Sequence, residues 1–459
     1  MVQRMRSSRH GGFTLIELMV AMVLGLLVAA GIITVFASTS SSNKAQTQLA
    51  QLQEEGRFAI TRLSTDLRMA NGQYCTNSGG VAQAGSGGLY LDHLRSPQVY
   101  AKSLIGGVGA TSGALHDVTT AWGATSGSLT YPAAPTAMYS MPSFLFMRGY
   151  DCTTAACTPM DPHDAISDIP AQGTTLNSRV LGSDVITVRY IDPSAGWSIG
   201  SPGGSSIATS SSTGVINSIT LSPLTASGEP LATNFTNGDL AMLADCSNAE
   251  IFAVTDAGGV LTPDPTNNFA GSSPAAEQPE SAPRLYDVNR DFQTVTYYLK
   301  VVSVNNDGNP PFTGALMRRV NGNDTNHHGG SDQELVRGVE RLDFSYGVQD
   351  ASGNTSFLTA SQVEASTNCP PSELNAVTTA GCLWRAVNSI EVSVLMDGQV
   401  PLYTLGADDL KYAYTVDGNT APVAPEDSSR AVTPQQQGFP DQLLRRQFTA
   451  LVAIRNYNP

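Results

Sequence analysis

One apolar run near the N-terminus, FTLIELMVAMVLGLLVAAGIITVFA, constrains this chain more than any other feature. It extends from Phe13 to Ala37, and as a helix rising about 1.5 Å per residue it would be about 37 Å long, enough to cross a hydrocarbon core of about 30 Å with some tilt. One carboxylate, Glu17, lies inside it, although an acidic side chain deep in a membrane helix costs on the order of 3 kcal/mol. We therefore expect a membrane span in which Glu17 has a compensating role.

The residues before the run predict its orientation. They include Arg4, Arg6, Arg9 and His10 and no acidic residue. Because positive charge is retained on the cytoplasmic side of a span, we expect a single-pass protein with a cytoplasmic N-terminus and an exported C-terminal region.

Two simpler interpretations of the run stay open. A secretory signal peptide would use the small-residue site at Val35 to Ser38, but the apolar core of such a signal is about 7 to 15 residues long and carries no charge. An ordinary uncleaved anchor explains the length of the run but not Glu17. Gly25 and Gly31 fit ordinary membrane-helix composition or close approach between helices.

The helical pattern continues beyond the membrane segment. Apolar residues recur at helical spacing after the polar stretch STSSSNKAQ, at Leu49, Leu52, Ile60, Leu63 and Leu67. This stripe predicts that one side of the helix packs against a partner surface, and that the helix reaches about Ala70. Charged residues mostly fill the opposite, solvated face: Glu54, Glu55, Arg57, Arg62, Asp66 and Arg68.

Charge argues against nucleic acid as a ligand. The chain has 25 Lys and Arg residues against 39 Asp and Glu residues, a net charge of −14. No basic cluster is longer than a pair, such as Arg318-Arg319 or Arg445-Arg446. We therefore expect no direct nucleic-acid binding by the exported region.

The chain has 6 cysteines, and all of them follow the membrane run. An even number in an exported chain favours disulfides. Short separations suggest the local pairs Cys152-Cys157 and Cys369-Cys382, which leaves Cys75-Cys246 to hold the end of the helix near the rest of the fold. Fifteen pairings are formally possible. Zinc is the alternative, but no CxxC spacing or neighbouring histidine supports it, and we expect no metal.

The exported region is rich in predicted strands. The predicted segments share β-branched and aromatic residues with partial alternation, and they are Ser183–Asp192, Val215–Leu221, Gly238–Cys246, Ala249–Thr255, Gln293–Val304, Gly314–Val320, Leu342–Val348, Ser389–Met396 and Gln447–Asn456. A short helical turn is predicted just before Leu342. Segments rich in Gly, Ser, Ala, Thr and Pro predict long loops at Gly79–Gly88, Gly106–Ser128, Gly200–Thr213 and Ala257–Pro283.

Motifs of catalysis are missing from the sequence. It contains no GxSxG elbow, no HExxH helix, no P-loop and no GxGxxG after a strand. His163 and the pair His327-His328 are predicted to be loop histidines that are solvated or locally hydrogen-bonded. We therefore expect a protein that is not an enzyme and that uses no cofactor.

The N-terminal residues carry a resemblance. A basic leader followed by Gly12, Phe13, Thr14, Leu15, Ile16, Glu17 and Leu18 is similar to the class III signal of type IV prepilins and type II secretion pseudopilins. In that family a membrane peptidase cuts after the glycine and methylates the new N-terminus. The resemblance implies that Gly12 ends the leader, that Phe13 becomes the methylated N-terminus, and that Glu17 pairs with the N-terminal ammonium of a neighbouring subunit.

Later segments are similar to PilW-type minor pilins. They are DCSNAEIFAVT, YYLKVV, ALMRRVNG, QELVRGVERLDFSYGV and LRRQFTALVAIRN. The resemblance implies an α+β, pilin-like fold, in which a long N-terminal helix packs on an antiparallel β-rich globular domain with long Gly/Ser-rich loops. The expected parts are a leader (1–12), a membrane half of the helix (13–37), an amphipathic half (38–70) and an exported domain (71–459) that has one or two lobes.

The same resemblance implies a structural function. We expect a minor pilin that is incorporated into type IV pili, in a priming complex at the tip that supports pilus biogenesis, twitching motility or adhesion. The expected partners are prepilin peptidase, other minor and major pilins and the inner membrane, and the expected location changes from the inner membrane, with a periplasmic domain, to the pilus at the cell surface. A type II secretion pseudopilin is the alternative, and a membrane-anchored exported hydrolase is a remote one.

Overall fold

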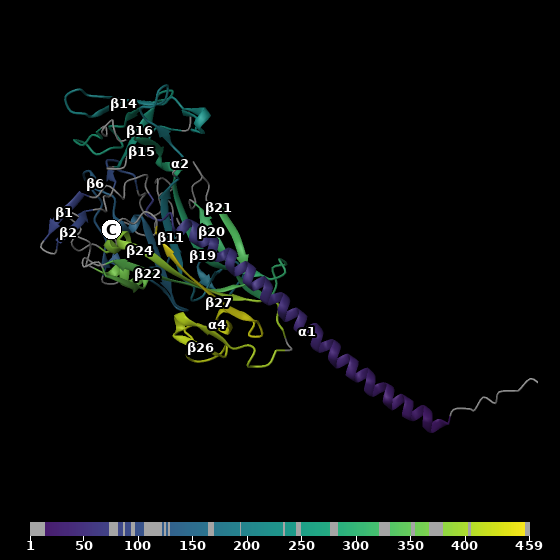
Figure 1. Cartoon of the computed structure of the whole chain (residues 1–459). Coiled ribbons are helices and arrows are strands. Elements are labelled where there is room, and N and C mark those ends of the chain that lie inside the picture. The colour runs from purple at the N-terminus through teal and green to yellow at the C-terminus, as the bar shows by residue number, and fades with distance from the viewer. Residues whose placement is uncertain are drawn as a thin grey trace, which may run out of the picture.

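A single long helix and three β-sheets make up most of the described chain (Figure 1). The computed structural model describes residues 14–72, 81–85, 88–92, 97–104, 122–123, 125–126, 129–163, 169–192, 194–232, 235–244, 249–275, 283–320, 331–349, 354–366, 380–402 and 405–454. Helix α1, Leu15–Leu67, is 53 residues long. Its first half extends away from the domain and its second half lies on the sheets (Figure 1).

Helix α1 is continuous through the polar stretch that separates its two halves. Ser and Thr compete with the backbone for hydrogen bonds and are neutral to unfavourable inside helices. The stretch contains no Gly or Pro between Thr39 and Gln48, so nothing in it forces the helix to end. The helix ends near Asn71, which has a φ of +60°, a conformation that Asn tolerates better than most residues.

The first sheet has the path β21-β20-β19-β11-β7-β8, with β10 beside β19 and β9 beside β10. Its strands are β7 (Met147–Cys152), β8 (Cys157–Thr158), β9 (Gln172–Gly173), β10 (Arg179–Val180), β11 (Val185–Ile191), β19 (Phe292–Ser303), β20 (Phe312–Val320) and β21 (Ser331–Arg337). All pairings in this sheet are antiparallel except that between β9 and β10.

The second sheet is antiparallel and has the order β23-β22-β24-β27. Its strands are β22 (Val339–Gln349), β23 (Thr355–Leu358), β24 (Val387–Asp397) and β27 (Arg445–Ala453). Helix α1 packs against β24 and β27 of this sheet and against β21 of the first sheet. One residue, Gly338, joins β21 to β22, so the chain passes directly from one sheet to the other beneath the helix.

The third sheet caps the end of the domain that lies away from the free half of α1 (Figure 1). Its path is β12-β18-β15-β16-β17-β14-β13, with β3 beside β16 and β6 beside β3. Its strands are β3 (Gln98–Val99), β6 (Tyr139–Ser140), β12 (Trp197–Ser198), β13 (Ser206–Thr209), β14 (Ile216–Thr220), β15 (Leu240–Ala244), β16 (Ala249–Asp256), β17 (Val260–Pro263) and β18 (Arg284–Asp287).

Three hairpins, three short α-helices and four 3₁₀-helices complete the described elements, the 3₁₀-helices being Ser143–Leu145, Thr225–Ser227, Cys382–Ala386 and Thr415–Asp417. The hairpins pair β1 (Val81–Gly85) with β2 (Gly88–Asp92), β4 (Thr125–Ser126) with β5 (Leu129–Thr130), and β25 (Tyr412–Tyr414) with β26 (Asn419–Val423). The helices are α2 (Val288–Asp291), α3 (Ala360–Ala365) and α4 (Pro434–Gln437).

Strand β15 shows how the third sheet is held on both faces. Its side chains alternate between the two sides of the sheet, as period-two geometry requires. Leu240 and Met242 belong to the main core, which also contains the buried face of α1. Ala241 and Leu243 belong to a separate core that includes Trp197. Because each face meets a hydrophobic core, every residue of the strand is buried.

The predicted strands and the predicted α+β fold are confirmed. Each of the predicted segments contains a strand of the structure, namely β11, β14, β15, β16, β19, β20, β22, β24 and β27. The helical turn predicted before Leu342 is wrong, because Ser331–Arg337 forms the edge strand β21. The four predicted loops are also partly wrong: they contain β1, β4, β13 and β17, strands of two to five residues that each pair with a neighbouring strand.

Candidate assembly interface on the N-terminal helix

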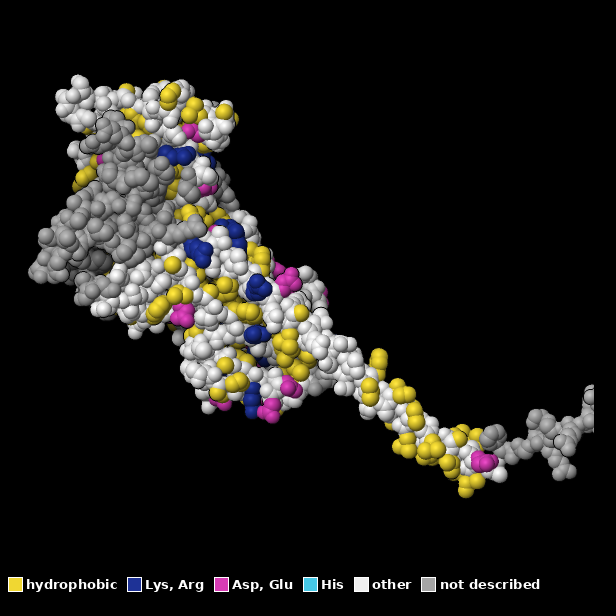
Figure 2. All heavy atoms as spheres, viewed as in Figure 1, with side chains coloured by type: hydrophobic (Ala, Val, Ile, Leu, Met, Phe, Trp, Pro, Cys, Tyr) yellow, Lys and Arg dark blue, Asp and Glu magenta, His cyan; other side chains and the backbone are white. Residues whose placement is uncertain are grey.

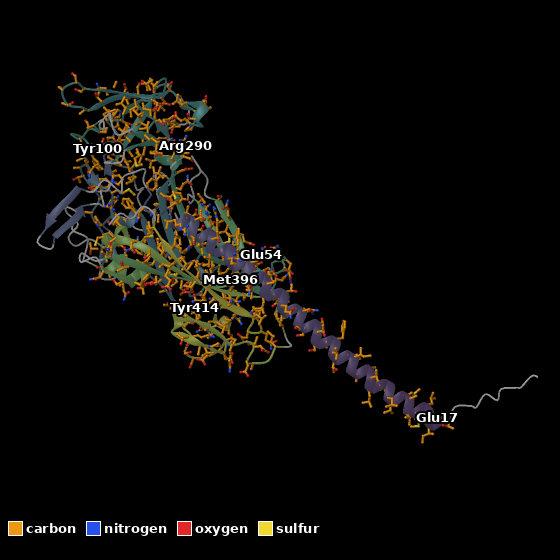
Figure 3. All side chains as sticks on the ribbon, in the orientation of Figure 1. Glu17, Glu54, Tyr100, Arg290, Met396 and Tyr414 are labelled. Atoms are coloured by element: carbon orange, nitrogen blue, oxygen red, sulfur yellow. A yellow bond between two sulfur atoms is a disulfide. The ribbon has the colours of Figure 1, made fainter. Side chains whose placement is uncertain are left out.

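The start of α1 is capped by its own first turn. The Thr14 N–H and O–H groups donate to Oε2 of Glu17 at 3.0 and 2.9 Å, and the Glu17 N–H donates to Oγ1 of Thr14 at 3.3 Å. This reciprocal capping box satisfies backbone donors that a helix start leaves open, and the carboxylate also favours the positive end of the helix dipole. Within the chain, Glu17 therefore has a local role that the sequence analysis did not assign to it. Glu17 lies at the end of α1 that is far from the domain (Figure 3).

The first half of α1 presents exposed apolar side chains, and they line the face of the helix seen in Figure 2. Leu15 is 78% exposed and Phe36 is 74% exposed, and the large side chains between them are similarly uncovered. Helix α1 is the one described helix that is long and apolar enough to cross a membrane. A Cβ added at Gly25 or Gly31 would meet no atom within 4 Å, so neither glycine is needed for packing within the chain.

The second half of α1 buries one face on the sheets. The buried side is formed by residues three or four apart, Gln48, Leu52, Gly56, Ala59, Leu63, Asp66 and Leu67. The predicted stripe is therefore confirmed at Leu52, Leu63 and Leu67. It is wrong at Leu49, which is 39% exposed, and it holds only in part at Ile60, which is half-buried.

Gly56 lies where the helix closely approaches β27 of the second sheet. A Cβ on Gly56 would lie 2.5 Å from two ring atoms of Phe448 in β27, which is shorter than any normal contact. Glycine inside a helix costs about 1 kcal/mol relative to alanine. The glycine at this position is explained by the aromatic ring that occupies the space of its side chain.

Asp66 connects α1 to three strands of the first sheet. Its Oδ2 accepts hydrogen bonds from Nε of Arg318 in β20 at 2.5 Å and from the hydroxyl of Tyr297 in β19 at 2.6 Å, and its Oδ1 accepts one from Tyr190 in β11 at 3.3 Å. Burial and the charge of Asp66 raise the pKa of Tyr190 to about 12. Burial opposes the charge of Arg318, but the hydrogen bond that Arg318 donates to Asp66 and the charge of Asp66 outweigh burial and raise the pKa of the guanidinium.

The prediction that Asp66 belongs to the solvated face is therefore wrong. Asp66 is 4% exposed and forms an ion pair with Arg318. Removing one partner of a buried pair typically costs about 3 to 5 kcal/mol. The network therefore fixes the position of the helix along the sheet and, with it, the distance between the domain and the apolar half of the helix.

A loop after β24 holds the helix where it first meets the domain. The side-chain amide of Gln48 donates to the carbonyl of Val400 at 2.9 Å, and that of Gln399 donates to Glu55 at 3.2 Å. Gln399 has a φ of +58°, and its backbone N–H donates to the buried carboxyl of Asp397 at 2.6 Å. Burial, aided by the charge of Glu340 and opposed by Arg445, raises the pKa of Asp397 to about 7.

The predicted disulfide between Cys152 and Cys157 is confirmed, and it closes the hairpin of β7 and β8. Cys382 is also disulfide-bonded. The pairings Cys369-Cys382 and Cys75-Cys246 remain predictions, because Cys75, Cys246 and Cys369 lie outside the described residues.

The processing residues Gly12 and Phe13 also lie outside the described residues. His163, predicted to be locally hydrogen-bonded, has its Nδ1 2.6 Å from the carbonyl of Ile169. His327 and His328 lie outside the described residues. Among the residues that the structure describes, no cluster of three His, Cys, Asp or Glu side chains is placed to hold a metal ion.

Four members of the buried face were not in the predicted stripe: Gln48, Gly56, Ala59 and Asp66. One signal was available for Gly56, because it stands four residues after Leu52 and three before Ala59, and small residues on an apolar stripe indicate close approach. No comparable signal existed for Asp66, whose partners are 124 to 252 residues away in the sequence.

Comparison with known families supports this arrangement. Residues 7–33 match the family described as the prokaryotic N-terminal methylation motif, and residues 296–456 match the family described as type IV pilus-assembly protein W. The second match spans β20, β21, β22, β24 and β27 and most of β19, and so it includes the three strands against which α1 packs, β21, β24 and β27, but not β11. It does not include DCSNAEIFAVT, which the sequence analysis used for the resemblance.

No curated protein and no solved structure matched the chain. The two family matches nevertheless include residues of both halves of the candidate interface: the exposed apolar start of α1, and the strands β21, β24 and β27 that hold its second half. These matches support a PilW-type minor pilin of the type IV pilus, through the N-terminal motif and residues 296–456.

Proposed function

We propose that this protein is cleaved after Gly12 by prepilin peptidase, anchored in the inner membrane with its domain in the periplasm, and then incorporated into type IV pili as part of a priming complex at the tip. The observation that carries the proposal is the division of α1 into two halves. One half is covered by the domain, and the other is apolar on all sides and uncovered by any described part of the chain. Lipid covers such a surface before assembly, and the helices of neighbouring pilins cover it afterwards.

Glu17 supplies the specific contact in this proposal. It is the one acidic residue in the apolar half of the helix, and it lies within the first turn. Cleavage after Gly12 creates an ammonium group on Phe13, one turn before the carboxylate. In the proposed complex Glu17 pairs with the Phe13 ammonium of the adjacent subunit, and this pairing offsets the cost of keeping a carboxylate in an apolar environment.

The third sheet supports a position at the tip. It lies at the end of the domain that is far from the apolar half of α1 (Figure 1), and it precedes the region that matches the pilus-assembly family. A subunit in the shaft must leave room for neighbours above and below it, whereas a subunit at the tip has free space above its domain. An additional lobe at this end is therefore most easily accommodated at the tip.

The first test uses the variants Glu17→Ala and Gly12→Leu. Glu17→Ala should still be cleaved and inserted, because the span becomes more apolar. It should nevertheless be recovered from sheared filaments at about one hundredth of the wild-type level or less, since an unmatched buried charge costs about 3 to 5 kcal/mol.

Gly12→Leu should block maturation, so that the membrane-extracted protein keeps residues 1–12. Intact mass of the membrane pool and the amount of the subunit in sheared filaments separate processing from docking.

Three outcomes would contradict parts of the proposal. A wild-type protein that begins at Met1 or Ser38, in cells with an active prepilin peptidase, would contradict the cleavage site. Glu17→Ala at the wild-type level in filaments would contradict the charge pair for this subunit. A correctly processed wild-type protein that never co-purifies with sheared pili would contradict incorporation into the pilus.

A further inference from the structure

The Cys152-Cys157 disulfide lies against a buried arginine. Arg179 in β10 is fully buried, and its Nη1 lies 3.2 Å from the sulfur of Cys152 and 3.2 Å from the sulfur of Cys157. Its Nη2 donates to Oδ1 of Asp161 at 2.7 Å, and its Nε donates to the carbonyl of Pro170 at 3.3 Å. The Nη1 group of the guanidinium is therefore directed at the two sulfur atoms.

The disulfide does not compensate the charge of this cation. A disulfide sulfur is uncharged and accepts hydrogen bonds weakly. Burial lowers the pKa of Arg179, and the nearby charge of Asp161 opposes that effect. The Asp161 side chain is 49% exposed, so water screens its attraction. Reduction of the disulfide would place a thiolate 3.2 Å from the guanidinium, where it would be a far stronger partner than the disulfide.

The other ionisable groups near Cys152 and Cys157 do not supply an anionic partner for Arg179 in place of a thiolate. Asp184 accepts the backbone N–H of Cys152 at 2.9 Å, but burial and the charges of Asp343 and Asp151 raise its pKa well above the usual value for a carboxyl. Tyr150, which precedes the pair in β7, lies in the same small core as both cysteines. Asp161 is therefore the main anionic competitor for Arg179.

We propose that Cys152-Cys157 is a thiol–disulfide exchange site whose dithiol form Arg179 stabilises, and that its reaction partner is a dithiol, either a small molecule or the active site of an exported oxidoreductase. A cation beside a cysteine lowers the pKa of the thiol, and stabilisation of the reduced form makes a disulfide more oxidising. Arg179 supplies this cation beside Cys152 and Cys157.

The exchange follows the usual two displacements. A thiolate of the external dithiol attacks one sulfur of the pair, which breaks the Cys152-Cys157 bond, forms a mixed disulfide and releases the other cysteine as a thiolate beside Arg179. The second thiol of the external dithiol then loses its proton and attacks the mixed disulfide, which releases the second cysteine. The external dithiol supplies both electrons and becomes a disulfide, and its protons pass to solvent or to the cysteine that is finally protonated.

Reduction would loosen a defined part of the fold. Strand β8 pairs with β7 alone among the described strands, and the pairing of β7 with β11 stops at Tyr150. The disulfide is therefore the covalent link that holds the β8 edge to the first sheet. Cys152 and Cys157 are 8% and 7% exposed, whereas the turn between them at 153–156 is mostly exposed, so an external dithiol reaches the sulfur atoms from the side of this turn when the turn opens.

The test is a redox titration of the full mature chain in detergent. The protein is equilibrated with mixtures of reduced and oxidised dithiothreitol, the thiols are alkylated, and the peptides that contain Cys152 and Cys157 are quantified by mass spectrometry. Arg179→Met should require a mixture about tenfold more reducing for half-reduction, because the cation is lost. Asp161→Asn should shift the midpoint several-fold in the opposite direction, because it removes the competing anion from an exposed site and leaves Arg179 in place.

The disulfide of Cys382 serves as the folding control. If Arg179→Met unfolds the domain, Cys382 also becomes reactive, and Asp161→Asn then decides the question. In the reduced wild-type protein, alkylation should follow a thiol pKa below the ordinary value of about 8.5. Midpoints of Asp161→Asn within twofold of wild type, or shifts of both variants in the same direction, would overturn the proposal.

Discussion

Asp66 is a buried ionisable residue that holds α1 on the first sheet, and its contacts are the least predictable part of the interface. Asp66 stands one residue before Leu67 and three after Leu63, so its helical position lies at the margin of the apolar stripe. Its burial is decided by Arg318, Tyr297 and Tyr190, which come from three separate strands. Sequence spacing describes a helix face, but it does not describe which distant side chains will meet that face.

Asp397 provides a prediction about pH. Its pKa is raised to about 7 in the folded chain, whereas an unperturbed Asp titrates near 3.9. The folded state therefore binds the proton more tightly than the unfolded state does. The free energy of unfolding should then decrease as pH rises from about 4 to about 7, by a contribution on the order of 4 kcal/mol, and this contribution should be constant above that range.

The variant Asp397→Asn isolates this contribution. An amide keeps the neutral form at every pH, so the difference in unfolding free energy between variant and wild type should change in favour of the variant as pH rises from 5 to 8. Burial likewise raises the pKa of Glu250 to about 7 and that of Asp287 to about 8, but both groups are present in each protein and cancel. Parallel pH curves for the two proteins, measured by thermal unfolding in detergent, would contradict a raised pKa at Asp397.

At the scale of elements, the bounds of α1 were predicted well, whereas the side of the helix that faces the sheets was predicted less well. Its apolar run and its stripe gave a helix from 13 to about 70, and the structure has Leu15–Leu67. The stripe placed Leu49 on the buried side because leucine is apolar, whereas the structure buries Gln48 instead. The reason is local: the loop after β24 offers the carbonyl of Val400 to the Gln48 amide, and hydrogen-bond partners of this kind leave no trace in hydrophobic periodicity.

Gly56 provides the prediction at this scale. Gly56→Leu should destabilise the protein by about 1 to 3 kcal/mol, because the new side chain collides with the Phe448 ring. This loss should appear even though leucine favours a helix by nearly 1 kcal/mol relative to glycine. Ala50→Leu is the matched control, because Ala50 is exposed on the same helix and should change stability little.

A second substitution tests the cause of that loss. If the collision is with Phe448, Gly56→Leu should cost less in a Phe448→Ala background, with a coupling of about 0.5 to 3 kcal/mol between the two sites. Thermal unfolding of the four proteins gives this coupling. Additive effects would show that the helix is held at this point by something other than the ring.

For the whole molecule, the strands were predictable but their grouping into sheets was not. β-branched and aromatic runs located β19, β20, β22, β24 and β27, because such residues fit a pleated, half-buried surface. Which strand pairs with which depends on contacts between distant segments, for example between β11 and β19, or between β24 and β27. The short strands β3, β6, β12, β13, β17 and β18 of the third sheet were missed because they are only two to four residues long, too short to show a period-two pattern.

The division of α1 also predicts how the chain behaves without its apolar half. The first buried residue of α1 is Gln48, and the side chains from Leu15 to Phe36 make no contribution to the domain's hydrophobic cores. A chain that begins at Thr39 should therefore fold without detergent. It should give a circular dichroism spectrum dominated by β-structure, and it should unfold at nearly the same temperature as the full mature chain. Aggregation of this shorter chain, or a spectrum dominated by helix, would contradict the conclusion that the domain holds its half of α1 independently and needs no contact with the apolar half.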